Sequence, residues 1–352
     1  MSGFDRSPLL AVLCDPRRFL ALDPLAQGLA FQRARRLVLA GRLAAGLAAV
    51  VDEGDPAPPL RAAVAGALRS QRYREGLIRR ELDILARDFL PRFGAPVVAL
   101  KGAAYLIRGL DAALGRIAAD VDLLVRERDV DQAAALLGSL GYTVAEEKDN
   151  PYDRRYYRVF MHEVAPMRHD ERGVELDLHF RLLPRTHRLA FPMDAVWERI
   201  RPAGTGGYFV LDDADLFIHA AIHFLIDGEG REATRRMLEL HDLLRLWPDP
   251  AAARAAVLPR ASELGLLRPL EAAFLLLDEL DDALAGRRPG TRPGPLRLAR
   301  RALWRVQEEE EGGRPAALAR FALWLRGHLL RMPLPLLARH LVTKWWRRRR
   351  GE

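Results

Sequence analysis

The sequence predicts a sheet-containing domain of the α/β or α+β class between two helical regions. Three observations lead to this prediction. Apolar residues return every three or four positions over residues 1–94, short β-branched runs alternate with helical patterns for about 110 residues after Pro96, and helical periodicity returns from Asp213. We therefore expect an N-terminal helical region at 1–94, a central core at 95–212 and a C-terminal helical region at 213–352.

The N-terminal region contains two long helical patterns. They cover residues 30–51 and 61–93, and residues 55–59 (DPAPP) form the loop between them. Pro91 and Gly94 are expected to end the second pattern, because proline lacks an amide hydrogen and glycine readily takes the left-handed conformation that follows a helix.

The central region alternates between two kinds of pattern. Two segments have helical periodicity, residues 102–110 (GAAYLIRGL) and 129–141 (DVDQAAALLGSLG). Five segments have the β-branched content or the alternation of strands: 96–102 (PVVALKG), 121–125 (VDLLV), 142–147 (YTVAEE), 157–167 (YRVFMHEVAPM) and 173–180 (GVELDLHF).

The periodicity of the C-terminal region predicts a series of helices, beginning with residues 213–228 and 231–247. Proline and glycine gather at residues 287–295 (RRPGTRPGP), which predicts a linker. Gly204 to Gly207 (GTGG) reads as a turn before a strand and not as a dinucleotide-binding loop, since no helical pattern follows it.

Composition and charge narrow the class of protein. Cys14 is the only cysteine, which excludes an internal disulfide and a cysteine-based zinc cluster. The net charge is +8, but residues 287–352 carry 17 Lys and Arg against 5 Asp and Glu, so the rest of the chain is slightly acidic. Apolar runs are too short to cross a membrane, and the first residues lack the pattern of a secretory signal. We expect a globular, cytoplasmic protein.

The stretch LGRIAADVDLLV contains the main candidate for chemistry. Asp120 and Asp122 are two residues apart, so in a strand both side chains point to one face. In GVELDLHF the same alternation places Glu175, Asp177 and His179 on one face. If the two strands are neighbours, the carboxylates gather into an oxygen-rich site that suits a hard divalent ion such as Mg²⁺. Pairs of such ions serve phosphoryl and nucleotidyl transfer.

The alternative is that the Asp-x-Asp pair is structural, because aspartate is common at the start of strands as a turn former. A Lys-Gly turn before the pair, Gly115-Arg116 just ahead of it and an acid-bearing strand after it favour the functional interpretation.

As a set, these motifs resemble the uncharacterised nucleotidyltransferase family of the DNA polymerase β-like superfamily. The resemblance is carried by ALKGAAYLIRGL, GRIAADVDLLV and GVELDLHFRLL, which lie within residues 97–183. ADLFIHAAIHF and RMLELHDLLRL, at residues 214–224 and 236–246, are similar to the carboxy-terminal part of that family. The resemblance implies an α+β fold, in which a small mixed nucleotidyltransferase sheet with helices is flanked by the two helical regions.

The resemblance also implies roles for single residues. Asp120 and Asp122 would ligate two Mg²⁺ ions, and Asp177 would complete the metal site and help to activate an acceptor hydroxyl. Gly102 would let the backbone approach the nucleotide phosphates at a helix start, where unpaired N–H groups favour anions. Lys101 and Arg116 would neutralise the triphosphate. From the residues alone, Lys101 and Arg116 are equally explained as solvated loop or strand-end residues.

The implied function is that of a metal-dependent nucleotidyltransferase of the EC 2.7.7 type, with Mg²⁺ as cofactor and an NTP such as ATP as co-substrate. The nucleoside monophosphate would move to an acceptor hydroxyl or phosphate. A small molecule or biosynthetic intermediate is favoured over nucleic acid, because the chain outside the tail is net negative. The alternative is an inactive copy of the fold that acts as an adaptor for membrane or RNA.

Two further features of the sequence are a histidine pair, for which we expect a structural role, and a basic tail, whose role stays open. His219 and His223 are four residues apart on a predicted helix, but Ala220 and Ala221 stand where a zinc-protease motif has its glutamate, so core or supporting histidines are expected. After about Arg314 we expect amphipathic helices that end in Lys344, Trp345, Trp346 and Arg347 to Arg350. This basic tail fits either peripheral contact with an anionic membrane, at its inner face, or a packed helix with a solvated end, and RNA binding is a third alternative.

Overall fold

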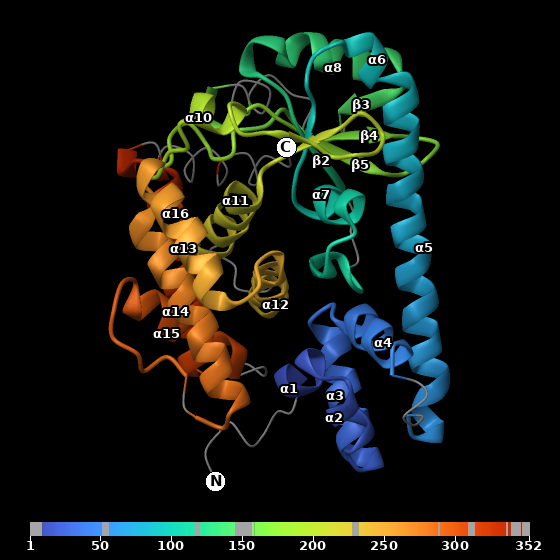
Figure 1. The fold of residues 1–352 in the computed structure, drawn as a ribbon, viewed down its shortest axis with the longest axis vertical. Helices are drawn as coiled ribbons and strands as arrows, with labels where there is room; N and C mark the ends of the chain where they lie inside the picture. Colours follow the sequence, from blue (N-terminus) through green and yellow to red (C-terminus); the bar gives the residue numbers. More distant parts are fainter. Residues whose placement is uncertain are drawn as a thin grey trace.

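The computed structural model describes residues 9–50, 56–116, 120–144, 157, 159–226, 232–287, 289–308, 314–335, 337–338 and 346. In these residues, one mixed sheet of seven strands is surrounded by many helices (Figure 1). The predicted α+β class is confirmed. The division at residues 94 and 212 stays a prediction.

The sheet has the order β3-β4-β5-β2-β1-β7-β6. Its two five-residue strands, β2 and β5, are central and parallel, and β1 also runs parallel to β7; the other neighbours are antiparallel. The strands are β1 (Val98–Ala99), β2 (Asp120–Leu124), β3 (Tyr142–Val144), β4 (Met167–His169), β5 (Glu175–His179), β6 (Arg201–Pro202) and β7 (Phe209–Val210).

Short helices connect these strands. Gly109 and Gly94 end two short helices in the left-handed conformation, with φ of 62° and 70°. Helix α6 (Leu90–Phe93) precedes β1, and the connecting helices are α7 (Lys101–Arg108), η3 (Asp111–Ala113), η4 (Glu127–Asp129), α8 (Val130–Ser139) and α10 (Met193–Trp197).

The N-terminal helices form a small cluster beside one long helix. The cluster is made of α1 (Leu9–Cys14), α2 (Arg17–Leu20), α3 (Pro24–Arg36) and α4 (Ala40–Ala48), and it buries its own apolar core. The predicted first helix is thus two helices, because Val38 takes a left-handed φ of 59°. The long helix is α5 (Pro58–Asp88), whose second half buries Ile78, Leu82 and Leu85 under the sheet.

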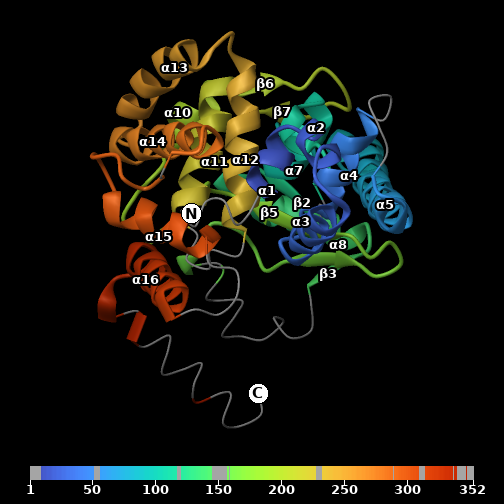
Figure 2. The same cartoon turned by 90° about the horizontal axis from the view of Figure 1, so that it is seen from below.

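The C-terminal helices share the main hydrophobic core with the sheet. In Figures 1 and 2, α13 to α16 lie on one side of the molecule and α1 to α5 on the other, with α11 and α12 between them. These helices are α11 (Asp213–Ile226), α12 (Ala233–Leu243), η6 (Leu244–Leu246), α13 (Pro250–Glu263), α14 (Leu267–Leu284), α15 (Arg297–Glu308) and α16 (Arg314–Arg331).

One predicted strand is wrong over most of its length. Within residues 157–167, residues 159–160 are helical and Glu163 makes only an isolated bridge with His179. Regular pairing starts at Met167, directly after Pro166, which has no amide hydrogen to donate to a strand ladder. Alternation in the sequence therefore reflected single buried side chains, not a strand.

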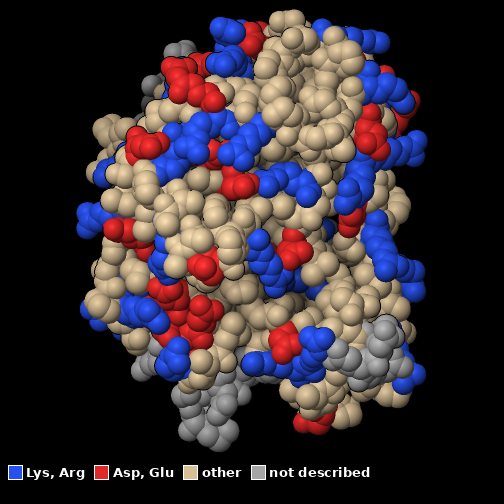
Figure 3. Space-filling model, viewed as in Figure 1, with Lys and Arg blue, Asp and Glu red and all other residues tan. Residues whose placement is uncertain are grey.

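The basic tail lies largely outside the described residues. Residues 314–331 form the expected helix, and Trp346 is about half exposed. Lys344, Trp345 and Arg347 to Arg350 lie outside the described residues, so the membrane and packed-helix alternatives both stay predictions. In the described part of the chain, no helix is long and apolar enough to cross a membrane. The face in Figure 3 carries basic and acidic side chains interspersed.

Buried ion pairs join the helical regions. Arg42 of α4 donates two hydrogen bonds, of 2.6 and 3.0 Å, to the carboxylate of Asp242 in α12. Arg260 of α13 makes a matching pair, of 2.8 and 2.9 Å, with Asp215 of α11. Such two-pronged contacts fix both orientation and distance, so α12 is held firmly against the N-terminal cluster.

Candidate active site

Two neighbouring strands bring the predicted acids together. In the parallel register of β2 and β5, Asp122 lies opposite Asp177 and Asp120 lies opposite Glu175. Side chains alternate along a strand, so all four carboxylates project to one face while the leucines and Val121 between them are buried on the other. The strand adjacency on which the predicted site depends is therefore present.

Asp122 is the buried centre of the group, with 1% of its surface exposed. Its Oδ1 accepts a hydrogen bond from Lys101 Nζ at 2.5 Å and lies 2.9 Å from His179 Nε2. Burial acts to raise the pKa of Asp122, but the Lys101 ammonium and the His179 contact overcome it and hold that pKa well below its usual range. Asp122 is accordingly a carboxylate at neutral pH.

Asp177 and Asp120 show the opposite behaviour. Burial, followed by the carboxylates of Glu163 and Asp122, raises the pKa of Asp177 to about 7. Burial and the charge of Asp122 also raise the pKa of Asp120. Carboxyl groups held this close resist ionising together unless a cation joins them. The site therefore has an excess of negative charge that a bound cation would relieve.

Lys101 and Gly102 form the turn from β1 into α7. Lys101 has a φ of 45°, which is unusual for a residue other than glycine, and this conformation directs its ammonium to Asp122. A Cβ built on Gly102 would lie 2.8 Å from Arg116 Nε, so glycine leaves the space that the arginine occupies. The Lys-Gly turn thus places one cation and makes room for another.

Arg116 reaches the same region from the loop before β2. Its Nη1 donates a 2.5 Å hydrogen bond to Oε1 of Glu239 in α12, and its guanidinium carbon lies 5.9 Å from the centre of the Tyr105 ring. The preceding Gly115 has a φ of 65°, and a Cβ there would lie 2.1 Å from the Cα of Arg42. The close approach of α4 therefore demands glycine next to Arg116.

A pocket of about 220 Å³ opens at these residues. Its lining contains both Asp120 and Asp122 and three arginines, which gives a place for a metal-bound anion. Its lining residues are Lys101, Tyr105, Arg116, Asp120, Asp122, Ala220, His223, Glu232, Arg235, Arg236 and Glu239.

The donor set fits a divalent cation. One ligand atom from each of Asp122, Asp177 and His179 lies within 4.8 Å of the other two, and two of the three donors are carboxylates. Asp120 lies outside this compact group and faces the pocket instead. The structure thus groups Asp122 and Asp177 with His179 and places Asp120 in the pocket lining.

The sequence did not indicate several residues around the site. His162 and Glu163 lie in the segment expected to be a strand, and Glu163 Oε2 is 3.4 Å from His179 Nδ1. Arg235, Arg236 and Glu239 come from α12, more than 110 residues after β2. A glutamate and two arginines on one polar face of a helix were the only available signal, and such faces are common.

The two histidines of α11 take supporting positions. His219 is buried, and its ring centre lies 4.5 Å from that of His223, which lines the pocket. Burial lowers the pKa of His219 to about 3, so the ring is neutral at physiological pH. Among the described residues, neither histidine belongs to a group with metal-ligand spacing.

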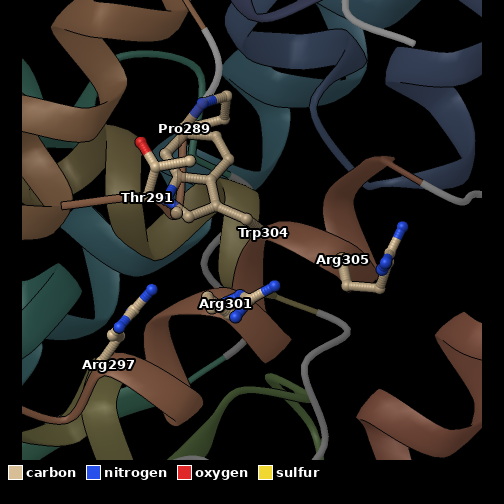
Figure 4. A pocket seen from close by; sticks show the side chains of 7 residues that line it. Pro289, Thr291, Arg297, Arg301, Trp304 and Arg305 are labelled. Atoms are coloured by element: carbon tan, nitrogen blue, oxygen red, sulfur yellow. The ribbon is translucent and has the colours of Figure 1, made fainter. Parts of the chain in front are cut away.

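A second pocket lies between the linker and α15. It has about 180 Å³ and is basic, since its lining residues are Pro289, Gly290, Thr291, Arg297, Arg301, Trp304 and Arg305. The three arginine side chains extend separately along α15 and do not converge on one point (Figure 4). This pocket contains no carboxylate and is not a candidate for metal chemistry.

A carboxylate pair on adjacent strands, beside a pocket that contains lysine and arginine side chains, is typical of proteins that bind nucleotide phosphates together with divalent metal ions. The chain belongs to the uncharacterised nucleotidyltransferase family, whose model matches residues 24–281. This finding confirms the resemblance, and it indicates nucleotidyltransferase function with an NTP as substrate. No curated protein and no solved structure matches the chain.

Proposed function

We propose that the protein is a metal-dependent nucleotidyltransferase of the EC 2.7.7 type, which transfers a nucleoside monophosphate from an NTP such as ATP to an acceptor. The observation that carries the proposal is the pair Asp122 and Asp177 on adjacent strands, with Asp122 and Asp120 lining a pocket that also contains Lys101 and three arginines. Family membership supports the class of reaction.

The metal would be held by Asp122 and Asp177, with Asp120 as the further carboxylate on the pocket side. Mg²⁺ bound there supplies charge neutralisation at the phosphate that is transferred. Oxygen ligands are those that Mg²⁺ prefers, and after burial the neighbouring carboxylates of Glu163 and Asp122 contribute to the raised pKa of Asp177.

The cations of the pocket would bind the triphosphate. Lys101 and Arg116 each have a carboxylate partner, Asp122 and Glu239, that fixes the position of the charged group. Arg235 lies 3.5 Å from the same Glu239, so a second guanidinium is held beside the first. Prearranged donors of this kind stabilise developing negative charge without reorganisation during the reaction.

Asp177 would also receive the proton of the acceptor. The acceptor oxygen attacks the α-phosphorus, the bond to pyrophosphate breaks, and the acceptor proton passes to the Asp177 carboxylate. As a carboxylate opposite Asp122 in the neighbouring strand, Asp177 is placed to act as this general base. Since the chain outside its tail is net negative, we propose a small acceptor and not a nucleic acid.

Nucleotide binding in the presence of Mg²⁺ tests the proposal. A non-hydrolysable NTP at about 100 times its Kd should stabilise the protein by about 2.7 kcal/mol, which thermal unfolding detects. Asp122→Asn should abolish the Mg²⁺-dependent part of this shift. Glu175→Gln, an exposed carboxylate on the same strand face, is the matched control and should keep it. The absence of any shift with all four NTPs would refute the proposal.

A further inference from the structure

A second group of potential metal ligands shares His179 with the group that contains Asp122 and Asp177. His162 and Glu163 precede β4, and the backbone bridge between Glu163 and His179 holds this segment against the end of β5. One donor atom from each of His162, Glu163 and His179 lies within 4.8 Å of the other two. His162 and His179 are both at least nine-tenths buried. The proposed nucleotidyltransferase mechanism uses neither His162 nor Glu163.

The two distances from Glu163 to the histidines are close to those between neighbouring ligands of a tetrahedral metal site. Glu163 Oε2 lies 3.4 Å from His179 Nδ1 and 3.7 Å from His162 Nε2. Zinc bonds to nitrogen and oxygen of about 2.0–2.1 Å place neighbouring tetrahedral ligands about 3.3–3.4 Å apart. Both distances are too long for good hydrogen bonds but close to this ligand–ligand separation.

The hydrogen bonding of His179 leaves one nitrogen directed at this group. Asp122 is ionised, as its 2.5 Å contact with the Lys101 ammonium requires, so His179 Nε2 must donate its hydrogen to Asp122. In the neutral ring, Nδ1 is then a bare acceptor that faces the Glu163 carboxylate. Among the described residues, the buried Nδ1 has no hydrogen-bond partner. Two facing acceptors require a cation or a proton between them.

We propose that His162, Glu163 and His179 bind one divalent transition-metal ion of the zinc type. Two imidazoles and one carboxylate favour such an ion over Mg²⁺, which prefers oxygen ligands alone. A ligating histidine usually donates its other N–H to a carboxylate, and His179 has that partner in Asp122. The Glu163 side chain is 16% exposed, which leaves an opening for water as the fourth ligand.

The ion would give His179 a positioning role. His179 stands between the two sites, with Nε2 toward Asp122 and Nδ1 toward Glu163. A metal on Nδ1 would fix the tautomer and the angle of the ring, and thereby the position of the Asp122 carboxylate. The competing arrangement is an imidazolium ring that bridges the two carboxylates without a metal.

Zinc binding by the full chain, without nucleotide, distinguishes the two arrangements. The protein is freed of metal with a chelator and dialysed against ZnCl2 in the presence of excess Mg²⁺, and bound zinc is measured by elemental analysis. We expect one equivalent per chain, and an intense tetrahedral absorption when Co²⁺ replaces zinc. His162→Gln and Glu163→Gln should each weaken binding by about 100-fold or more, since even supporting residues of metal sites contribute 10–100-fold.

Two control variants show which carboxylate group holds the ion. Asp177→Asn should keep the zinc, because Asp177 belongs only to the group on the Mg²⁺ side. His219→Gln removes a buried histidine outside both groups and should also keep it. The proposal is overturned if the unaltered protein binds no zinc and gives no cobalt spectrum, if His162→Gln binds zinc as tightly as the unaltered protein, or if Asp177→Asn alone loses it. None of these outcomes depends on nucleotide binding.

Discussion

The buried charges of the helical flanks are arranged differently from those of the carboxylate face, which is the face of the sheet that carries Asp120, Asp122, Glu175 and Asp177. In the flanks two buried acids have matched cations: Asp242 is held by Arg42, and Asp215 by Arg260, through paired hydrogen bonds. On the carboxylate face, Lys101 bonds directly to Asp122, while the pKa of Asp177 is raised to about 7. Matched pairs are typical of structural contacts, and strongly perturbed groups in a pocket are typical of functional sites.

The largest effect on folding is therefore expected in the flanks. Arg42→Ala should lower the free energy of unfolding by about 3–5 kcal/mol, because it leaves the Asp242 carboxylate buried without its main partner. Urea unfolding measures this change. The double variant Arg42→Met with Asp242→Leu should recover most of the loss, since an apolar pair of similar size often replaces a buried ion pair without cost.

Removing a carboxylate from the carboxylate face should raise the free energy of unfolding, which is the opposite of the effect expected for Arg42→Ala. The folded-state pKa of Asp177, about 7, is above its unfolded value, so the native protein loses stability as pH rises from about 4 to 7. Asp177→Asn removes this loss, and we expect it to raise stability by about 1–3 kcal/mol at pH 8 and by almost nothing at pH 4. Denaturation at both pH values tests the sign. A destabilised variant at pH 8 would contradict the excess of negative charge.

The affinity for Mg²⁺ should follow the same titration. Because the ion must displace the proton of Asp177, its affinity in the absence of nucleotide should fall about tenfold for each pH unit below 7. Above pH 8 the affinity should be constant. Isothermal titration from pH 5 to pH 9 measures the profile, and Asp177→Asn should flatten it. A flat profile in the unaltered protein would show that Asp177 is ionised throughout.

Sequence reasoning found the part of the site that lies on local, periodic elements. The alternation in DVDLL and ELDLH predicted which side chains share a face, and the parallel register of β2 and β5 places Asp122 opposite Asp177. The roles assigned to these residues stay predictions. Contacts that depend on distant elements could not be read in this way: Glu239 meets Arg116 across 123 positions. His162 and Glu163 were missed because the alternating pattern of their segment predicted a strand, whereas residues 159–160 are helical.

The smallest expected effect concerns the turn between Lys101 and Arg116. In Gly102→Ala the added Cβ would lie 2.8 Å from Arg116 Nε, which is too close, so the guanidinium must move. Glu239 anchors the far end of that side chain at 2.5 Å, which restricts the movement. We expect the affinity for a non-hydrolysable NTP to fall about three- to tenfold, or roughly 1 kcal/mol, while the fold persists.

The matched control is Gly76→Ala in α5, where nothing lies within 4 Å of the new Cβ. That change should stabilise the helix by up to about 1 kcal/mol and leave the affinity unaltered, because alanine favours helix interiors over glycine. Equal nucleotide affinities in the two variants would show that the position of Arg116 over Gly102 is structural and has no part in binding the triphosphate.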